Sequence, residues 1–133
     1  MSLTDPATRR VVAVVPDLFF SAKIAAVAKA AGVELVIVPQ AQALAACAAP
    51  PPALVLLDLH APGEPLALVR ALKAGTATRA IPVVGFYSHV EDARRRDALA
   101  AGIDRALPRS AFVAQLPALL EGGAPEAGSG TPA

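Results

Sequence analysis

The segment "ALVLLDLHAPGE", residues 53–64, is an apolar run that ends on a single carboxylate and then turns. A run without polar residues is typical of a strand that is covered on both faces of a parallel sheet. Asp58 closes the run, and a carboxylate at the end of a buried strand would cost desolvation energy if it had no role there. We therefore expect Asp58 to belong to a site. The loop that follows contains His60, Pro62 and Gly63.

Short β-branched runs alternate with longer Ala-rich, charge-bearing segments along the rest of the chain. This alternation indicates βα units around a parallel sheet, and the predicted fold class is α/β. The expected strands are residues 10–15, 33–38, 53–58, 81–86 and 103–107.

Helices are expected between and after these strands. A helix in residues 18–32 has its apolar stripe on Phe20, Ile24, Val27 and Ala31. Phe19 lies off this stripe, so we expect either an exposed interaction patch or a second core contact there. Further helices are expected in segments 40–52, 65–75, 90–102 and 111–120. Ser110 is the expected cap of the last one, and Pro117 is expected to kink or shorten it.

Length and composition indicate one domain with a core of small side chains. The chain has 133 residues, of which 55% are hydrophobic and only 4% aromatic. A formal net charge of +1 creates no long-range field that would collect nucleic acid or an anionic membrane. Cys47 is the only cysteine, which excludes an intrachain disulfide and a cysteine-based zinc site, and we expect it to be buried.

The chain is expected to divide into an N-terminal segment, residues 1–9, a folded domain, residues 10–120, and a disordered tail or linker, residues 121–133. The last segment is rich in Gly, Pro and Ala and has almost nothing to bury. The sequence has no secretory leader pattern and no long uninterrupted apolar run, which predicts a soluble, cytoplasmic protein.

Polar side chains follow the carboxyl ends of the expected strands, where ligands of open parallel sheets bind. If the first and third strands are neighbours, as in the order 2-1-3-4-5, Asp17 and Asp58 share one crevice. The polar residues after the fourth and fifth strands are Tyr87, Ser88, His89 and Arg109. His89 is interpreted as an ordinary loop residue.

Residues from about 10 to 120 resemble the receiver domains of bacterial two-component response regulators. The block "LVLLDLHAPG" is similar to the family's third-strand block, in which the terminal Asp accepts a phosphoryl group and a Pro-Gly follows. The blocks "IPVVGFYSH" and "ALAAGIDRALPRS" resemble its fourth-strand and fifth-strand blocks. The resemblance implies a flavodoxin-like, doubly wound, three-layer sandwich with five parallel strands in the order 2-1-3-4-5. It also implies phosphorelay signalling with a histidine kinase or an output protein as partner.

In that family, an acidic pair after the first strand and the phosphoacceptor Asp hold a magnesium ion, while a Thr or Ser and a Lys contact the phosphoryl oxygens. Cations are needed because phosphoryl transfer to a carboxylate brings anions together. The resemblance makes Asp58 the phosphoacceptor candidate and Asp17 and Asp58 weak magnesium ligands. The remaining candidate site residues are Tyr87, Ser88 and Arg109.

The chain departs from this pattern. Pro16 replaces the first acid, and losing a supporting carboxylate weakens a metal site by roughly 10-fold to 100-fold, so magnesium binding is expected to be weakened. Tyr87 is in register with the small hydroxyl, and Ser88 comes one residue late. A phenol there would crowd a phosphoryl group or hang outside. Arg109 exchanges a compact ammonium for a wide planar fork. Ala106 stands where many receivers have an aromatic residue that changes rotamer on activation.

Simpler interpretations stay open beside these. Asp17 can cap the helix that follows it. His60 completes a D-x-H-x-x-G pattern found in cobalamin-binding domains, although their companion segments are not evident. The run 94–96, "RRR", suggests nucleic acid, but acidic neighbours make a solvated helix face the better interpretation. A pairing of Arg109 with Asp58 would supply a built-in cation in place of part of the magnesium charge.

The predicted function is therefore an atypical receiver module that acts mainly by protein–protein interaction, with a degraded phosphoacceptor site at Asp58. The alternative is a functional magnesium-dependent receiver that a histidine kinase phosphorylates on Asp58. No dedicated catalysis is expected beyond self-phosphorylation at that residue. The resemblance implies a partner or homodimer face on the fourth helix, fifth strand and fifth helix, with Arg105 and residues 94–96 as candidate contacts. Neither nucleic acid nor a membrane is expected as a partner.

Overall fold

The computed structural model describes residues 9–48, 50–88 and 92–122, in which strands and helices alternate. The strands are β1 (Arg10–Val14), β2 (Glu34–Ile37), β3 (Leu54–Asp58), β4 (Val83–Tyr87) and β5 (Arg105–Pro108). The helices are α1 (Leu18–Ala30), α2 (Gln40–Ala48), α3 (Pro65–Ala74), α4 (Asp92–Ala100) and α5 (Arg109–Glu121).

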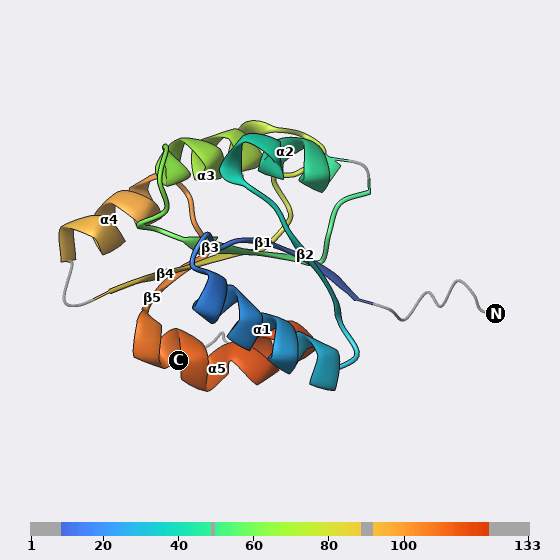
Figure 1. Cartoon of the computed structure of the whole chain (residues 1–133). Coiled ribbons are helices and arrows are strands. Elements are labelled where there is room, and N and C mark those ends of the chain that lie inside the picture. The colour runs from blue at the N-terminus through green and yellow to red at the C-terminus, as the bar shows by residue number, and fades with distance from the viewer. Residues whose placement is uncertain (1–8, 49, 89–91, 123–133) are drawn as a thin grey trace.

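The strands form one parallel sheet in the order β2-β1-β3-β4-β5, which confirms the predicted fold class and strand order. Helices α2, α3 and α4 cover one face of this sheet, and α1 and α5 cover the other, as Figure 1 shows. The first crossover connection runs from β1 to β2 at one edge of the sheet. The chain then reverses direction and adds β3, β4 and β5 toward the other edge.

The apolar run of β3 divides its side chains between two buried clusters. Val55 and Leu57 pack under α2, α3 and α4, whereas Leu54 and Leu56 pack on α1 and α5. Because both faces of the sheet are covered, both sets of alternating side chains are buried, and the strand therefore has no polar residue before Asp58.

The fourth and fifth strands begin two residues later than their apolar runs predict, at Val83 and Arg105. Asp104 accounts for part of this difference, because its Oδ2 accepts hydrogen bonds from the Val83 backbone N–H at 2.7 Å and from Lys73 Nζ at 2.7 Å. The side chains of Ile81 and Ile103 are buried without belonging to a strand.

Helix α5 differs from its prediction at both ends. It begins at Arg109 directly after β5, so Ser110 lies within its first turn and is not the N-cap. Pro117 does not shorten the helix, which continues to Glu121 and ends at Gly122 with a φ of 83°. The buried side chains of Leu119 and Leu120 anchor the turn beyond the proline against the sheet.

The exposed positions of α1 settle the two interpretations of Phe19. Its side chain is 91% exposed and that of Leu18 is 81% exposed, so Phe19 makes no second core contact. The buried stripe of the helix is Phe20, Ser21, Ile24 and Ala28. The predicted stripe member Val27 is only partly buried, and Ala31 is the C-cap residue.

Segments 1–8 and 123–133, which contain most of the two predicted terminal regions, lie outside the described residues. Within residues 9–48, 50–88 and 92–122, no helix is both long enough and apolar enough to cross a lipid bilayer.

Candidate functional site

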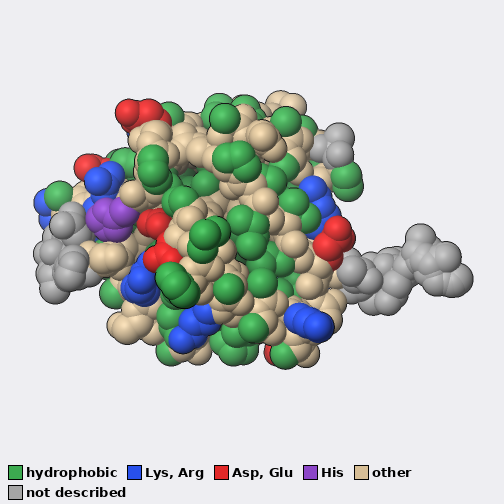
Figure 2. All heavy atoms as spheres, viewed as in Figure 1, with side chains coloured by type: hydrophobic (Ala, Val, Ile, Leu, Met, Phe, Trp, Pro, Cys, Tyr) green, Lys and Arg blue, Asp and Glu red, His purple; other side chains and the backbone are tan. Residues whose placement is uncertain are grey.

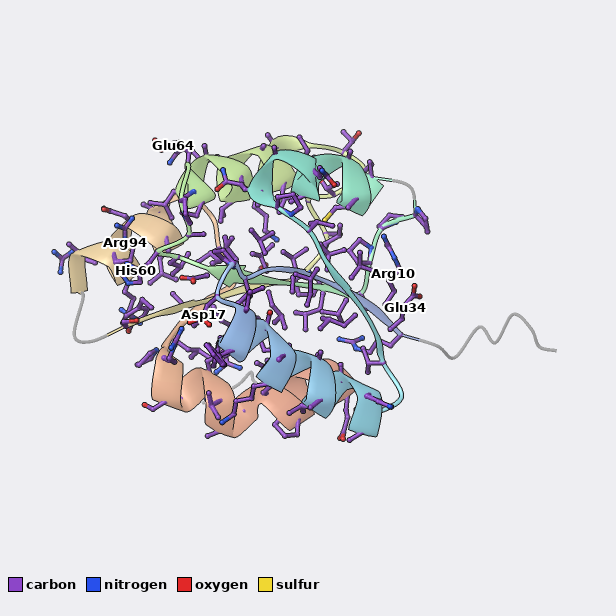
Figure 3. All side chains as sticks on the ribbon, viewed as in Figure 1. Arg10, Asp17, Glu34, His60, Glu64 and Arg94 are labelled. Atoms are coloured by element: carbon purple, nitrogen blue, oxygen red, sulfur yellow. The ribbon has the colours of Figure 1, made fainter. Side chains whose placement is uncertain are left out.

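The register of the sheet brings the two predicted aspartates to the same edge. Val14 at the end of β1 pairs with Leu57, so Asp58 lies level with Val15, two residues before Asp17. Figure 3 shows Asp17, His60 and Arg94 at this end of the molecule, whereas Arg10 and Glu34 lie at the opposite end. The carboxyl ends of β1 and β3 therefore lie side by side at one edge of the sheet, where the sequence predicts a shared site.

Asp58 is partly buried and organises the turn that follows β3. Its Oδ1 accepts a hydrogen bond from the His60 backbone N–H at 2.8 Å, and its carbonyl oxygen accepts one from Ala61 N–H at 3.0 Å. The Leu59 N–H donates to the Phe86 carbonyl at 3.0 Å, which ties this turn to β4. The side chain is thus held at the rim by its own backbone contacts.

Asp17 caps helix α1, as the simpler interpretation predicts. Its Oδ1 accepts from the backbone N–H groups of Phe19 at 2.9 Å and Phe20 at 3.0 Å. These amides begin the helix and have no partner within it, so a carboxylate at the N-cap satisfies them and interacts favourably with the helix dipole.

Arg109 pairs with Asp17 and stacks on an aromatic surface. Its guanidinium Nη2 lies 4.0 Å from Asp17 Oδ2, and its Cζ lies 4.2 Å from the centre of the Phe20 ring and 5.7 Å from that of Phe86. Its Nε is buried and has no hydrogen-bond partner among the described residues. An ion pair at this distance with half-exposed partners contributes at most about 1 kcal/mol, so the contact with the Phe20 ring is at least as important in orienting the guanidinium.

The cap predicts a specific pattern of stability changes at Asp17. Asp17→Ala should lower the free energy of unfolding by about 0.5–2 kcal/mol, because two N–H groups of α1 lose their acceptor. Asp17→Asn keeps an acceptor oxygen and should lose much less. Urea denaturation followed by circular dichroism measures both values. Equal losses for Ala and Asn would mean that the charge near Arg109, and not the cap, is the main contribution.

The residues at the end of β4 differ in how deeply their side chains are buried. Tyr87 is only 6% exposed and belongs to the cluster under α2, α3 and α4, so its ring does not hang outside the crevice. Ala106 of β5 is buried in the same cluster. Ser88 follows β4 and is partly buried, and His89 lies outside the described residues.

Two carboxylates at this edge of the sheet are the oxygen donors that a magnesium ion would meet. Magnesium prefers octahedral oxygen ligands from one or two carboxylates and several waters. Asp17 and Asp58 are the carboxylates here, but Asp17 Oδ1 already accepts two N–H groups and its Oδ2 faces Arg109. Across the described ranges, no group of three or more His, Cys, Asp and Glu side chains is placed to hold a metal ion.

Sequence reasoning did not find the aromatic support beneath Arg109. Phe20 and Phe86 come from α1 and β4, and their rings lie 4.9 Å apart. The only available signal was that Phe20 belongs to a core stripe that begins beside Asp17. That position is compatible with many partners. The pairing considered from the sequence was that of Arg109 with Asp58, and the structure pairs Arg109 with Asp17.

Comparisons with known proteins bear on the fold. No family model matches the sequence, and no curated protein matches it. Solved structures do match. A response regulator from Hahella chejuensis is 23% identical with a TM-score of 0.75, and the match covers 85% of this chain and 92% of that one. The chain has the receiver fold.

Two further structures with the receiver fold are informative. The phosphorylated cyanobacterial phytochrome response regulator RcpA is 20% identical with a TM-score of 0.72, covering 87% of this chain and 91% of its own. The receiver domain of a sensor histidine kinase from Pseudomonas aeruginosa PAO1, which holds a magnesium ion in its active-site cleft, is 18% identical with a TM-score of 0.74. That match covers 87% of this chain and 99% of the domain. At these identities the receiver fold is what the three proteins share with this chain.

Proposed function

We propose that this chain is an atypical receiver module of phosphorelay-type signal transduction that acts mainly through contacts with other proteins. In this proposal Asp58 is a degraded phosphoacceptor site, and the partners are a histidine kinase, an output protein, or both. The receiver fold supports the signalling class, and the environment of Asp17 supports the degraded site.

The observation that carries the proposal is the engagement of both Asp17 oxygens. Oδ1 is held by two backbone N–H groups, and Oδ2 faces the Arg109 guanidinium at 4.0 Å. A carboxylate that binds magnesium must turn its oxygens toward the ion, so Asp17 would have to give up the cap, the arginine, or both. With Pro16 in place of a second acid, the residue beside Asp17 in the sequence cannot take over that role.

Arg109 also affects how the negative charge of the aspartates is neutralised. Its guanidinium neutralises part of the charge that a metal ion would neutralise, and it does so without a bound ligand. A phosphoryl group on Asp58 would add negative charge at the rim, where the Arg109 cation is already shared with Asp17 and fixed over Phe20. The crevice therefore has little capacity to stabilise that added charge.

A test uses the His60 amide as the reporter, because this N–H donates to Asp58 Oδ1. In the unmodified chain, magnesium with beryllofluoride should give no saturable shift of the His60 amide resonance at millimolar magnesium. The variant Pro16→Asp with Arg109→Lys supplies the acid and the compact cation, and it should bind magnesium about 10-fold to 100-fold more tightly. The measurement is a two-dimensional ¹H–¹⁵N NMR titration.

Asp58→Asn is the matched control in both backgrounds and should abolish any beryllofluoride response. Acetyl phosphate with mass spectrometry of the peptide containing Asp58 provides an independent measurement. Saturable occupancy of the unmodified chain at millimolar magnesium would favour the alternative, a working receiver phosphorylated on Asp58. No response in the folded double variant would contradict the role proposed for Pro16 and Arg109.

A further inference from the structure

Among the described residues, strand β2 is an edge of the sheet, and its outer hydrogen-bonding side meets no other strand. Within the sheet β2 pairs with β1 only. The Glu34 N–H donates to the carbonyl oxygen of Arg9, just before β1, at 2.8 Å, and the Val38 N–H donates to that of Ala13 in β1 at 3.0 Å. Because the hydrogen-bonding direction alternates along a strand, the backbone groups of Leu35 and Ile37 point away from β1. Such a row of groups is a template for another strand.

Strand β2 after Glu34, and the chain from there to the end of β3, carry no charged side chain before Asp58. The sequence has no Asp, Glu, Lys, Arg or His between Glu34 and Asp58. Strand β2 crosses in front of β1 in Figure 1, so Figure 2 looks onto this edge and shows hydrophobic and uncharged atoms at its centre, with charged side chains toward the margins. Ile37 is 44% exposed and Leu44 is 42% exposed. The exposed apolar residues of β2 and α2 are Ile37, Ala41, Leu44, Ala45 and Ala48.

The other edge of the sheet is protected in the usual way. Strand β5 begins with Arg105 and ends with Pro108, and Asp104 precedes it. Charged residues and proline on an edge strand discourage pairing with another chain. Strand β2 carries such residues only at its margins, in Glu34 and in Pro39 just beyond the strand, so Leu35, Val36 and Ile37 form an uninterrupted apolar stretch of this edge.

We propose that a second copy of this chain pairs with β2 in antiparallel orientation, about a two-fold axis at Val36, and joins the two sheets into one. About this axis Leu35 lies opposite Ile37 of the partner subunit, and each such pair exchanges both of its outward backbone hydrogen bonds. Val36 then lies opposite Val36 of the partner subunit as the closer, non-hydrogen-bonded pair. The register thus uses every outward-pointing group of Leu35 and Ile37.

The charges of the two copies are compatible with this register. Glu34 lies opposite Val38 of the partner subunit and not opposite its own copy, so the only charged residues of the two strands are kept apart. Helix α2 begins two residues after Val38, at Gln40. Each Glu34 carboxylate therefore lies near the N-terminal end of the other copy's α2, where the helix dipole favours negative charge.

A cysteine placed on the axis tests the register directly. The Cα atoms of a non-hydrogen-bonded antiparallel pair are about 4.5 Å apart, which is within the range of a disulfide. Under mild oxidation Val36→Cys should form a disulfide-linked dimer. Glu34→Cys should not, because the two copies of residue 34 are several residues apart along the strands. The unmodified chain, whose native cysteine is Cys47, gives the baseline level of cross-linking. This level should be low, because Cys47 is buried and burial raises the pKa of its thiol.

Sedimentation velocity of the full chain over a concentration series provides the second measurement. Ile37→Lys, which puts a charge at the centre of the contact, should raise the dimer dissociation constant at least about 10-fold, or about 1.4 kcal/mol. Leu99→Lys is the matched control, because Leu99 is 41% exposed and lies on α4, and it should leave the constant unchanged.

Each alternative outcome would overturn the proposal. A chain that remains monomeric at about millimolar concentration contradicts it, as does a dimer that tolerates Ile37→Lys and is weakened by Leu99→Lys. Equal cross-linking by Val36→Cys and Glu34→Cys would contradict the register. Because Ile37 is exposed, its lysine variant is expected to fold. Circular dichroism of each variant checks this before sedimentation.

Discussion

Phe86→Ala should lower the free energy of unfolding by about 3–5 kcal/mol, a large part of the stability of a domain of this size. Phe86 is 1% exposed, and its ring centre lies 4.9 Å from that of Phe20 and 4.6 Å from that of Phe112. These rings come from β4, α1 and α5, so truncating the central one opens a cavity where the sheet meets both helices. In a chain with 4% aromatic residues, this cluster is the largest concentration of ring contacts available to the core.

Urea denaturation with circular dichroism as the signal measures this loss, and Phe19→Ala is the matched control. Phe19 is 91% exposed, so its truncation should change the free energy by no more than about 0.5 kcal/mol. The two substitutions remove the same atoms from neighbouring parts of the fold. A loss below about 1 kcal/mol for Phe86→Ala would mean that the cluster collapses around the cavity and is not a rigid support for Arg109.

Gly85→Ala should destabilise the protein by about 1–3 kcal/mol, although alanine is usually better than glycine inside a strand. A Cβ at residue 85 would lie 2.8 Å from Ile103 Cδ1 and 2.9 Å from Leu59 Cγ. Both neighbours are buried, so neither can move away without disturbing its own packing. Overpacking therefore outweighs the gain in backbone entropy.

Gly32→Ala separates this effect from backbone strain. Gly32 has a φ of 72°, and a Cβ there would meet nothing within 4 Å, so its substitution should cost only the left-handed conformation, about 1–2 kcal/mol. Combining Gly85→Ala with Ile103→Val, which removes the nearest clashing methyl group, should recover part of the loss in a double-mutant cycle. Additive losses in that cycle would show that the crowding at residue 85 lies elsewhere.

The spacing of the apolar runs was enough to predict the sheet, because parallel strands covered on both faces must be apolar at successive positions. The same reasoning placed β4 and β5 two residues early. Apolar residues at a strand entrance, such as Ile81 and Ile103, are buried whether or not they join the ladder. The start of β4 depends instead on Asp104, a residue 21 positions away that accepts the Val83 N–H.

In the candidate site, too, a local contact could be predicted from the sequence and contacts between distant residues could not. The cap by Asp17 could be predicted, since an N-cap depends on residues two and three positions along the chain. The expected cap by Ser110 was wrong because β5 runs directly into α5, and the strand sets where that helix starts. The pairing of Arg109 with Asp17, and its stacking on Phe20, could not be predicted, because these residues lie far apart in sequence and meet only through the packing of α1 against α5.

The sequence by itself determined the apolar strands, the position of Asp58 at the end of one of them and the cap of α1, because periodicity, turn chemistry and capping act over a few residues. The order of the strands came from the resemblance to receiver domains, and the structure confirms it. Tertiary structure alone decided which carboxylate Arg109 meets, that Tyr87 turns into the core, and that the uncharged edge of β2 is left without a neighbouring strand. These features depend on the distances between separate elements, and those distances are set by how the two buried clusters pack around the sheet.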